Sequence, residues 1–342
     1  MREALFIKKN RDKWIRYQHE PDSEPDEQAD RFITLLDDLA YSKTFYPQSK
    51  VTRWINSIAV SIYQNIYQSH REKSKRLITF WTTELPLLFY KHRKILLFAF
   101  LFFGVCVAIG AISSANDDLF IKAILGEGYV LQTEENIQKG DPFGIYRDSD
   151  KFSMFVMIAV NNIRVALQTF VAGIFFGIGT LYLLLYNGIM VGAFEQMFFA
   201  RGLGLQSLMV IWIHGTLEIA SIIIAGAAGL IMGNSILFPG TFSRFTSFKK
   251  GAKDALKIAI CLVPFFVSAA LLESYVTYLM SNTYSNLGDF GLPVWAGVLI
   301  LIVSASLIIW YFVIYPVQVH RSQSKKRTQK SKADYKAVVW QD

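Results

Sequence analysis

The sequence predicts an all-α protein: a polytopic helical membrane bundle of about six crossings, one of them short or re-entrant, preceded by an N-terminal cytoplasmic helical domain. Hydrophobic residues make up 52% of the chain, which is more apolar surface than a soluble fold of this size can bury. Charge is unevenly spread, because residues 154–233 contain only Arg164, Glu195, Arg201 and Glu218 as charged side chains. Several apolar stretches are also about as long as a bilayer is thick.

Residues 1–94 are predicted to form helices outside the bilayer. This region holds 17 Lys and Arg residues and 12 Asp and Glu residues, and so many charged side chains are typical of a water-exposed segment. Apolar side chains recur at helical spacing behind Ser49, which is a candidate N-cap, and they predict the seam of a small helical bundle. The segment 77–90 is predicted to be an interfacial helix that leads into the first span. The residues of the seam are Val51, Ile55, Ile58, Ile62 and Ile66.

Five membrane spans are predicted from apolar stretches of about 20 residues. Basic residues cluster in three regions that the positive-inside rule assigns to the cytoplasm. The segment 114–152 holds eight acidic against four basic residues and is therefore assigned to the outside. The spans are 95–113, 160–186, 206–233, 258–279 and 294–315, and the basic regions are 91–94, 234–257 and 321–336.

The parity of the crossings requires a sixth membrane element. Since an even number of crossings separates two cytoplasmic segments, the region 153–233 needs three crossings rather than two. The stretch 188–203 is too short for a standard span and is flanked by glycines, which favours a half-helix or re-entrant element enclosed by protein. The alternative has five spans, with 188–203 on the cytoplasmic surface and the basic tail outside. We expect the domains to be 1–94 (cytoplasmic), 95–316 (transmembrane, including the external segment 114–152) and 317–342 (a basic cytoplasmic tail).

Polar side chains inside apolar spans are costly, so each needs a partner or a function. His214 and Glu218 are four residues apart and therefore share one face of a helix. Three interpretations of this pair stay open: a structural hydrogen bond, a proton or ion relay in a transporter, and metal ligands in an intramembrane hydrolase. The rest of the polar set is Asn161, Asn162, Arg164, Gln168, Asn187, Glu195 and Glu273.

The metal interpretation needs at least one more good ligand, because the other histidines lie outside the spans and no HExxH motif is present. We therefore expect no metal, no cofactor and no catalytic residue. We also expect the protein not to be an enzyme, with the hydrolase kept as an alternative. Three alternatives are open for Arg164. It could form an ion pair with Glu218 or Glu195, bind a lipid phosphate, or extend to the outer interface about three residues away. Cys106 and Cys261 lie in apolar runs and form no recognisable disulfide or zinc motif.

Small residues are spaced as in helix-packing motifs of membrane proteins. We expect most of them to allow tight packing within the chain, and a homodimer seam is the alternative. The basic clusters are predicted to contact membrane lipid and not nucleic acid. The packing glycines are Gly173, Gly177, Gly188, Gly192, Gly226, Gly229 and Gly233.

Several segments resemble the stage II sporulation protein M family of integral membrane proteins. The opening, with Phe6-Ile7 and Trp14, is similar to the family's start, and Tyr46-Pro47 also fits. The most recognisable stretch is IHGTLEIA at 213–220, which resembles the family's His-Gly-x-x-Glu motif. Ile213 departs from it, because many members have proline there. The similar central segments are NNIRVAL at 161–167, GIGTL at 177–181, NGIMVG at 187–192 and AGAAG at 225–229.

The resemblance implies a multi-pass protein of the bacterial inner (cytoplasmic) membrane, and the parity of six crossings predicts that both termini lie in the cytoplasm. In endospore formers the namesake is associated with two cell-wall hydrolases in septal peptidoglycan remodelling, as an anchor rather than as the hydrolase. Most relatives occur in bacteria that make no spores, so sporulation itself is not carried over. The preferred hypothesis is a non-enzymatic scaffold for envelope machinery, with cell-wall hydrolases among its expected partners. The alternatives are a transporter or permease for a small solute, ion or lipid, and an intramembrane metal-dependent hydrolase.

Overall fold

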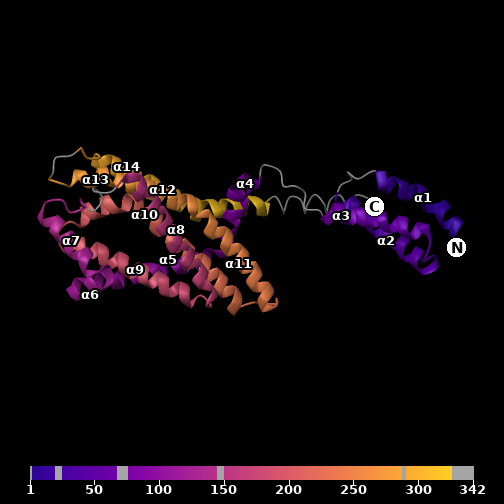
Figure 1. The fold of residues 1–342 in the computed structure, drawn as a ribbon, viewed down its shortest axis with the longest axis horizontal. Coiled ribbons are helices and arrows are strands. Elements are labelled where there is room, and N and C mark those ends of the chain that lie inside the picture. The colour runs from indigo at the N-terminus through magenta and orange to yellow at the C-terminus, as the bar shows by residue number, and fades with distance from the viewer. Residues whose placement is uncertain (1, 20–24, 68–75, 145–149, 287–289, 326–342) are drawn as a thin grey trace. The chain divides into compact units, whose positions relative to one another are not determined.

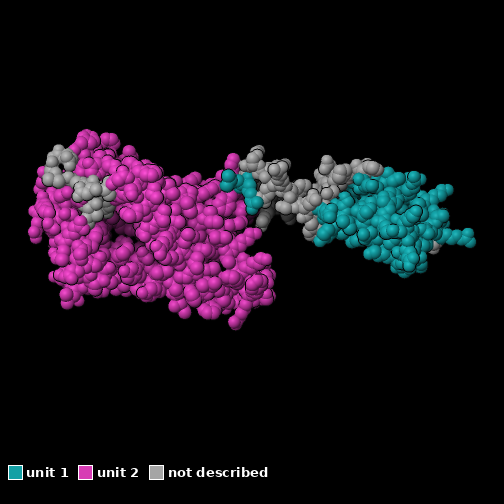
Figure 2. Space-filling view, viewed as in Figure 1, with its two compact units in different colours: residues 1–77 teal, residues 78–342 magenta. Residues whose placement is uncertain are grey.

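The computed structural model describes residues 2–19, 25–67, 76–144, 150–286 and 290–325, and these residues form helices and short connections with no strand among them (Figure 1). The chain divides into two compact units, Met1–Leu77 and Ile78–Asp342 (Figure 2). The predicted all-α class is therefore confirmed. The division between the units comes before the predicted domain boundary at residue 94, which lies inside a long helix.

The N-terminal unit consists of three helices, α1 (Glu3–His19), α2 (Pro25–Phe45) and α3 (Lys50–Tyr67). Ser49 stands at the start of α3, where its Oγ accepts a hydrogen bond from the backbone N–H of Val51 at 3.1 Å, as an N-cap should. Trp14 is fully buried, and its Nε1 donates to Asp38 Oδ2 at 2.7 Å. Except for Ile66, whose side chain is outside the described set, the predicted seam faces the core. The core residues are Phe6, Trp14, Leu35, Leu39, Ile55, Ile58, Ala59 and Ile62.

The second unit begins with one continuous helical run rather than a separate interfacial helix. It comprises α4 (Arg76–Thr79), the π-helical η1 (Phe80–Glu84) and α5 (Leu85–Asn116). A π-turn leaves backbone carbonyls outside the regular ladder, and two tyrosines satisfy them. Tyr311 Oη donates to the carbonyl of Trp81 at 2.9 Å, and Tyr315 Oη donates to that of Thr82 at 3.0 Å. The segment 77–90 therefore leads into the first span without interruption, and its interfacial position stays a prediction.

The region predicted as one span at 160–186 contains a chain reversal. Helix α8 (Lys151–Val171) is followed by the short η3 (Ala172–Ile174) and by α9 (Ile178–Phe199). Between them Phe176 has φ 54° and Gly177 has φ 83°, a left-handed conformation that glycine adopts without strain. The stretch 188–203 is not a half-helix, because most of it is the second half of the 22-residue helix α9.

Six helices of the described chain are long and apolar enough to cross a membrane, so the predicted number stands although the boundaries move. The fourth of them, α10 (Gly204–Leu237), is the central helix. It contacts neighbours on all sides (Figure 1), and every residue from 221 to 233 is buried. The six runs are Arg76–Asn116, Lys151–Ile174, Ile178–Phe199, Gly204–Leu237, Arg244–Thr283 and Val294–Lys325.

The fifth and sixth runs are each interrupted by a π-helical segment. The fifth consists of α11 (Arg244–Cys261), α12 (Val263–Leu271), η4 (Leu272–Thr277) and α13 (Tyr278–Thr283). The sixth begins with α14 (Val294–Ile309) and continues through η5 (Trp310–Ile314). The fifth run packs along α10, and this contact forms the site described below.

The segment predicted to be external forms a helical cap at one end of the bundle. It contains α6 (Asp118–Leu125) and α7 (Glu127–Gln138). Ile121 and Val130 join a buried cluster with Phe198 of α9 and Ile213 of α10. The cap is therefore packed on the bundle and marks the Gly204 end of α10 as the end next to it.

Candidate functional site

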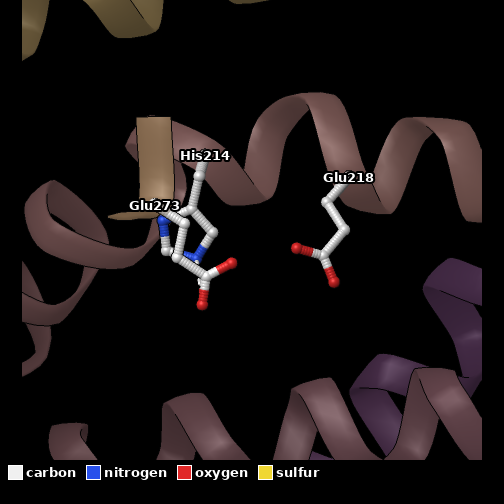
Figure 3. A group of neighbouring side chains, drawn as sticks. All are labelled: His214, Glu218 and Glu273. Carbon is white, nitrogen blue, oxygen red and sulfur yellow. Dashed lines mark ion pairs between the residues drawn. The ribbon is translucent and has the colours of Figure 1, made fainter. Parts of the chain in front are cut away.

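Three ionisable side chains meet where the fifth run crosses α10. His214 and Glu218 come from successive turns of α10, and Glu273 comes from η4. Each offers one ligand atom, and these atoms all lie within 4.8 Å of one another. Figure 3 shows the carboxylate of Glu273 beside the imidazole of His214, with the carboxylate of Glu218 pointing toward them from the next turn. We call these three residues the His–Glu–Glu cluster.

The π-helical segment η4 supplies two contacts to His214. Thr277 Oγ1 hydrogen-bonds to His214 Nδ1 at 2.8 Å, and Glu273 Oε1 lies 3.9 Å from His214 Nε2. Residues of the same segment therefore lie next to both nitrogens of the imidazole ring. Single π-turns inside α-helices are frequent at functional sites because they redirect side chains.

The cluster is not uniformly sealed. His214 is 4% exposed, whereas the side chain of Glu273 is 15% exposed and Glu218 is half-buried. The two carboxylates therefore line the accessible side of the cluster, and the imidazole forms its buried wall.

Asn162 of α8 stands next to Glu218, close enough for its amide to interact with the carboxylate. It is 7% exposed, and its Nδ2 has no hydrogen-bond partner of normal geometry among the described atoms. A buried donor without a partner costs about 1–3 kcal/mol. The amide of Asn162 is thus a buried donor beside the Glu218 carboxylate, without a hydrogen bond of normal geometry to it.

Charge balance restricts what the cluster can do. Two ionised carboxylates within a few ångströms of each other in a membrane-embedded site repel strongly. They are stable only with a bound cation or with at least one of them protonated. The geometry can therefore hold a proton or a metal cation between three donors.

The structure separates Arg164 from the cluster. Arg164 and Asn161 are exposed on α8, and Arg164 has no ion pair with Glu218 or Glu195 among the described contacts. Because α8 begins at Lys151, Arg164 lies about 20 Å along the helix from that end. Its predicted place about three residues from the outer interface stays a prediction.

Glu195 and Asn187, two further residues of the predicted polar set, have local partners. Glu195 accepts hydrogen bonds from Ser207 Oγ and, at 2.8 Å, from Trp212 Nε1. Asn187 Nδ2 donates to the carbonyl of Leu183 at 2.8 Å within its own helix. Neither residue belongs to the three-residue cluster.

Sequence reasoning noted Glu273 as an intramembrane carboxylate but did not place it with His214. Nothing in the sequence fixes which part of the fifth run meets α10. The available signal is that Glu273 and Thr277 are four residues apart, as His214 and Glu218 are. This spacing marks a second polar helix face in the same membrane region.

The predicted packing glycines lie at close approaches within the chain. A Cβ on Gly173 would stand 2.1 Å from the carbonyl oxygen of Gly229, and one on Gly192 would stand 2.0 Å from that of Val107. Such contacts bring helix backbones together in the way that small residues permit in membranes. A Cβ on Gly188, Gly226 or Gly233 would also stand within 2.7 Å of another helix or turn, whereas one on Gly177 would meet only ordinary contacts, the nearest at 3.4 Å.

The family model for stage II sporulation protein M matches residues 99–278. This is more than half of the chain and includes the whole His–Glu–Glu cluster. The chain belongs to this family. The predicted family membership is therefore confirmed, and the chain is a multi-pass membrane protein.

The N-terminal unit corresponds to a different family model. A domain of unknown function (DUF8413) matches residues 4–68, which is the extent of the three-helix unit. No curated protein and no solved structure matches the chain.

Proposed function

We propose that this member of the stage II sporulation protein M family is a non-enzymatic membrane scaffold that binds an envelope-associated partner through its N-terminal three-helix unit. The observation that carries the proposal is an exposed apolar surface on that unit. Ile33 and Leu36 of α2 are 58% and 41% exposed, and Val60 and Tyr63 of α3 are 45% and 49% exposed. We call these four residues the α2–α3 face.

Each pair of the α2–α3 face shares one side of its helix, because its members are three residues apart. The two helices are neighbours, since the ring of Phe32 contacts the ring of Tyr63 at 6.1 Å between centroids. The unit already has its own buried core, so these side chains are not needed to fold it. Exposed groups of large apolar side chains mark protein-binding surfaces.

The membrane unit supports the same role. It belongs to a family whose namesake acts as an anchor, and the helices α6 and α7 add a folded surface at the other end of the bundle from the basic loop 234–257. The positive-inside rule supports a cytoplasmic location of that loop and of both termini, and we propose that the membrane is a bacterial inner membrane. The expected partners on the outer side are cell-wall hydrolases.

Crosslinked capture from native membranes tests the proposal. Ile33→Glu should remove the main crosslinked partner, because it inserts a charge into the α2–α3 face. Leu5→Glu is the matched control: Leu5 is 57% exposed on α1, outside this face, and should keep the partner. Thermal unfolding would establish that both variants remain folded. Retention of the same partner by Ile33→Glu, or its equal loss from both variants, would contradict the proposal.

A second candidate is a cation-coupled permease, which the His–Glu–Glu cluster favours. Ionisable side chains inside membrane helices typically mark ion or proton pathways, and transporters often bind substrates at interrupted helices. In this case His214→Ala and Glu218→Gln should abolish uptake into vesicles at unchanged expression. Under the scaffold hypothesis the same variants should change only stability, by about 1–2 kcal/mol.

A further inference from the structure

We propose that His214, Glu218 and Glu273 form a binding site for a divalent transition metal of the zinc class within the membrane-embedded bundle. The proposal goes beyond the scaffold function and does not depend on it. It depends on the donor set, on the hydrogen bond of the histidine and on an unpartnered amide beside the cluster.

The donor set suits zinc. One imidazole nitrogen and two carboxylate oxygens are ligands that zinc binds in proteins, and three protein ligands leave a fourth position for water. Tetrahedral bonds of about 2.0–2.1 Å place ligand atoms about 3.3 Å apart. The three atoms now lie within 4.8 Å of one another, so small side-chain rotations of Glu218 and Glu273 suffice to close the site.

Thr277 orients the histidine for this role. His214 Nδ1 hydrogen-bonds to Thr277 Oγ1 at 2.8 Å, and in the tautomer with the proton on Nδ1 the lone pair of the ring is on Nε2. Nε2 is the nitrogen that faces Glu273, at 3.9 Å. Metal-binding histidines nearly always donate their other N–H to such an outer partner, which fixes the tautomer and the ring orientation.

Asn162 provides the independent observation. Its Nδ2 is buried beside Glu218 and has no partner of normal geometry. A glutamate that binds a metal through one oxygen presents the other oxygen to an outer donor. The amide of Asn162 stands beside Glu218 as a buried donor for that second oxygen.

Charge supports a divalent ion. A metal with two positive charges neutralises two carboxylates and leaves the imidazole uncharged, so the occupied site carries no net charge in the membrane. The empty cluster must instead protonate a carboxylate or retain an uncompensated charge in a medium that penalises it.

The test uses the full chain, purified in detergent with a tag that contains no histidine and stripped with a chelator. Zinc affinity is measured by competition with a chromophoric chelator, and Co²⁺ replaces zinc to report coordination through its visible d–d absorption. The wild-type protein should bind one zinc per chain. Glu273→Gln, which keeps the shape of the side chain, should weaken binding about 100-fold and remove the Co²⁺ spectrum.

Two further variants separate a built site from a general effect of charge. Thr277→Val should weaken zinc binding about 10–100-fold, because the histidine loses its outer partner. Glu195→Gln is the matched control: this intramembrane carboxylate is held by Ser207 and Trp212 and should leave the affinity unchanged. Gel filtration and melting of the metal-free variants would show that each is folded.

Three results would overturn the proposal. The first is a wild-type protein that binds no zinc. The second is a Glu273→Gln variant with wild-type affinity. The third is an equal loss of affinity in Glu195→Gln, which would mean that the metal binds by general charge rather than in the cluster.

Discussion

The closest approach of α10 to its neighbours allows a sharp test of the packing, with Gly229→Ala as the perturbation. A Cβ at this position would lie 2.3 Å from Thr180 Oγ1 and 2.7 Å from the carbonyl oxygen of Thr169. The same two groups share a buried hydrogen bond of 2.8 Å. The added methyl group therefore presses on the point where α8 and α9 are tied together.

The expected cost follows from these distances. Apolar contact is favourable near about 3.5–4.0 Å, so a neighbour must move by about 1 Å. Forcing one methyl group into a packed core costs about 1–3 kcal/mol. Strain on the threonine hydrogen bond adds about 0.6 kcal/mol, the average for such bonds in membranes. The gain in helix propensity over glycine, about 1 kcal/mol, leaves a net loss of about 2 kcal/mol.

Gly215→Ala is the matched control on the same helix. Its Cβ would meet only Ile211 and Ile219 side-chain atoms of α10, at 3.8 and 3.9 Å. This substitution should be neutral or should stabilise the protein by up to about 1 kcal/mol. Unfolding in mixed micelles by titration with denaturing detergent measures both. Equal stability of the two variants would refute the claim that backbone contact at Gly229 holds the bundle together.

Three other predictions concern ion pairing, the N-terminal core and topology. The charged atoms of Lys257 and Glu84 are 2.7 Å apart. Reversing the charge of one of them should destabilise the protein, and reversing both charges should restore its stability. A double-mutant cycle should give an interaction energy of at most about 1 kcal/mol, because both side chains are part-exposed. Trp14→Phe removes the donor to Asp38 and should cost about 1–2 kcal/mol in urea unfolding; an unchanged midpoint would show that this bond contributes nothing. A cysteine introduced at Lys139 should react with an impermeant maleimide in intact cells, and one at Thr241 should react only after permeabilisation. The native Cys106 and Cys261 are buried and should give little background. The reverse labelling pattern would show that the proposed topology is inverted.

The number of long helices was predictable because hydropathy and length suffice to find them. Their boundaries were not, and the reversal between α8 and α9 shows why. Gly177 packs against α10 near Gly233, whereas its neighbours Phe176 and Ile178 carry exposed apolar side chains. The turn therefore lies within an uninterrupted apolar run of the sequence. Hydropathy therefore reports one span where the chain forms the ends of two.

Only the part of the site that lies on a single helix was predictable from the sequence. The spacing of His214 and Glu218 within one helix is local, and it correctly places them on one face. Glu273 reaches them only because the fifth run packs along α10 and because η4 redirects its side chains. A π-turn has no reliable signal in a single sequence, so the third ligand and Thr277 depend on tertiary structure.

The close backbone packing around Gly229 and the His–Glu–Glu cluster lie on different parts of α10. The helix spans 34 residues, or about 51 Å, so Gly229 lies about 22 Å from His214. Around Gly229 the neighbouring backbones touch, and even a methyl group must displace them. Around Gly215, next to His214, a methyl group would meet only side chains of its own helix at ordinary contact distances. Of these two positions on α10, the one with backbone contact to its neighbours therefore lies away from the cluster, and the one beside His214 has room for a methyl group.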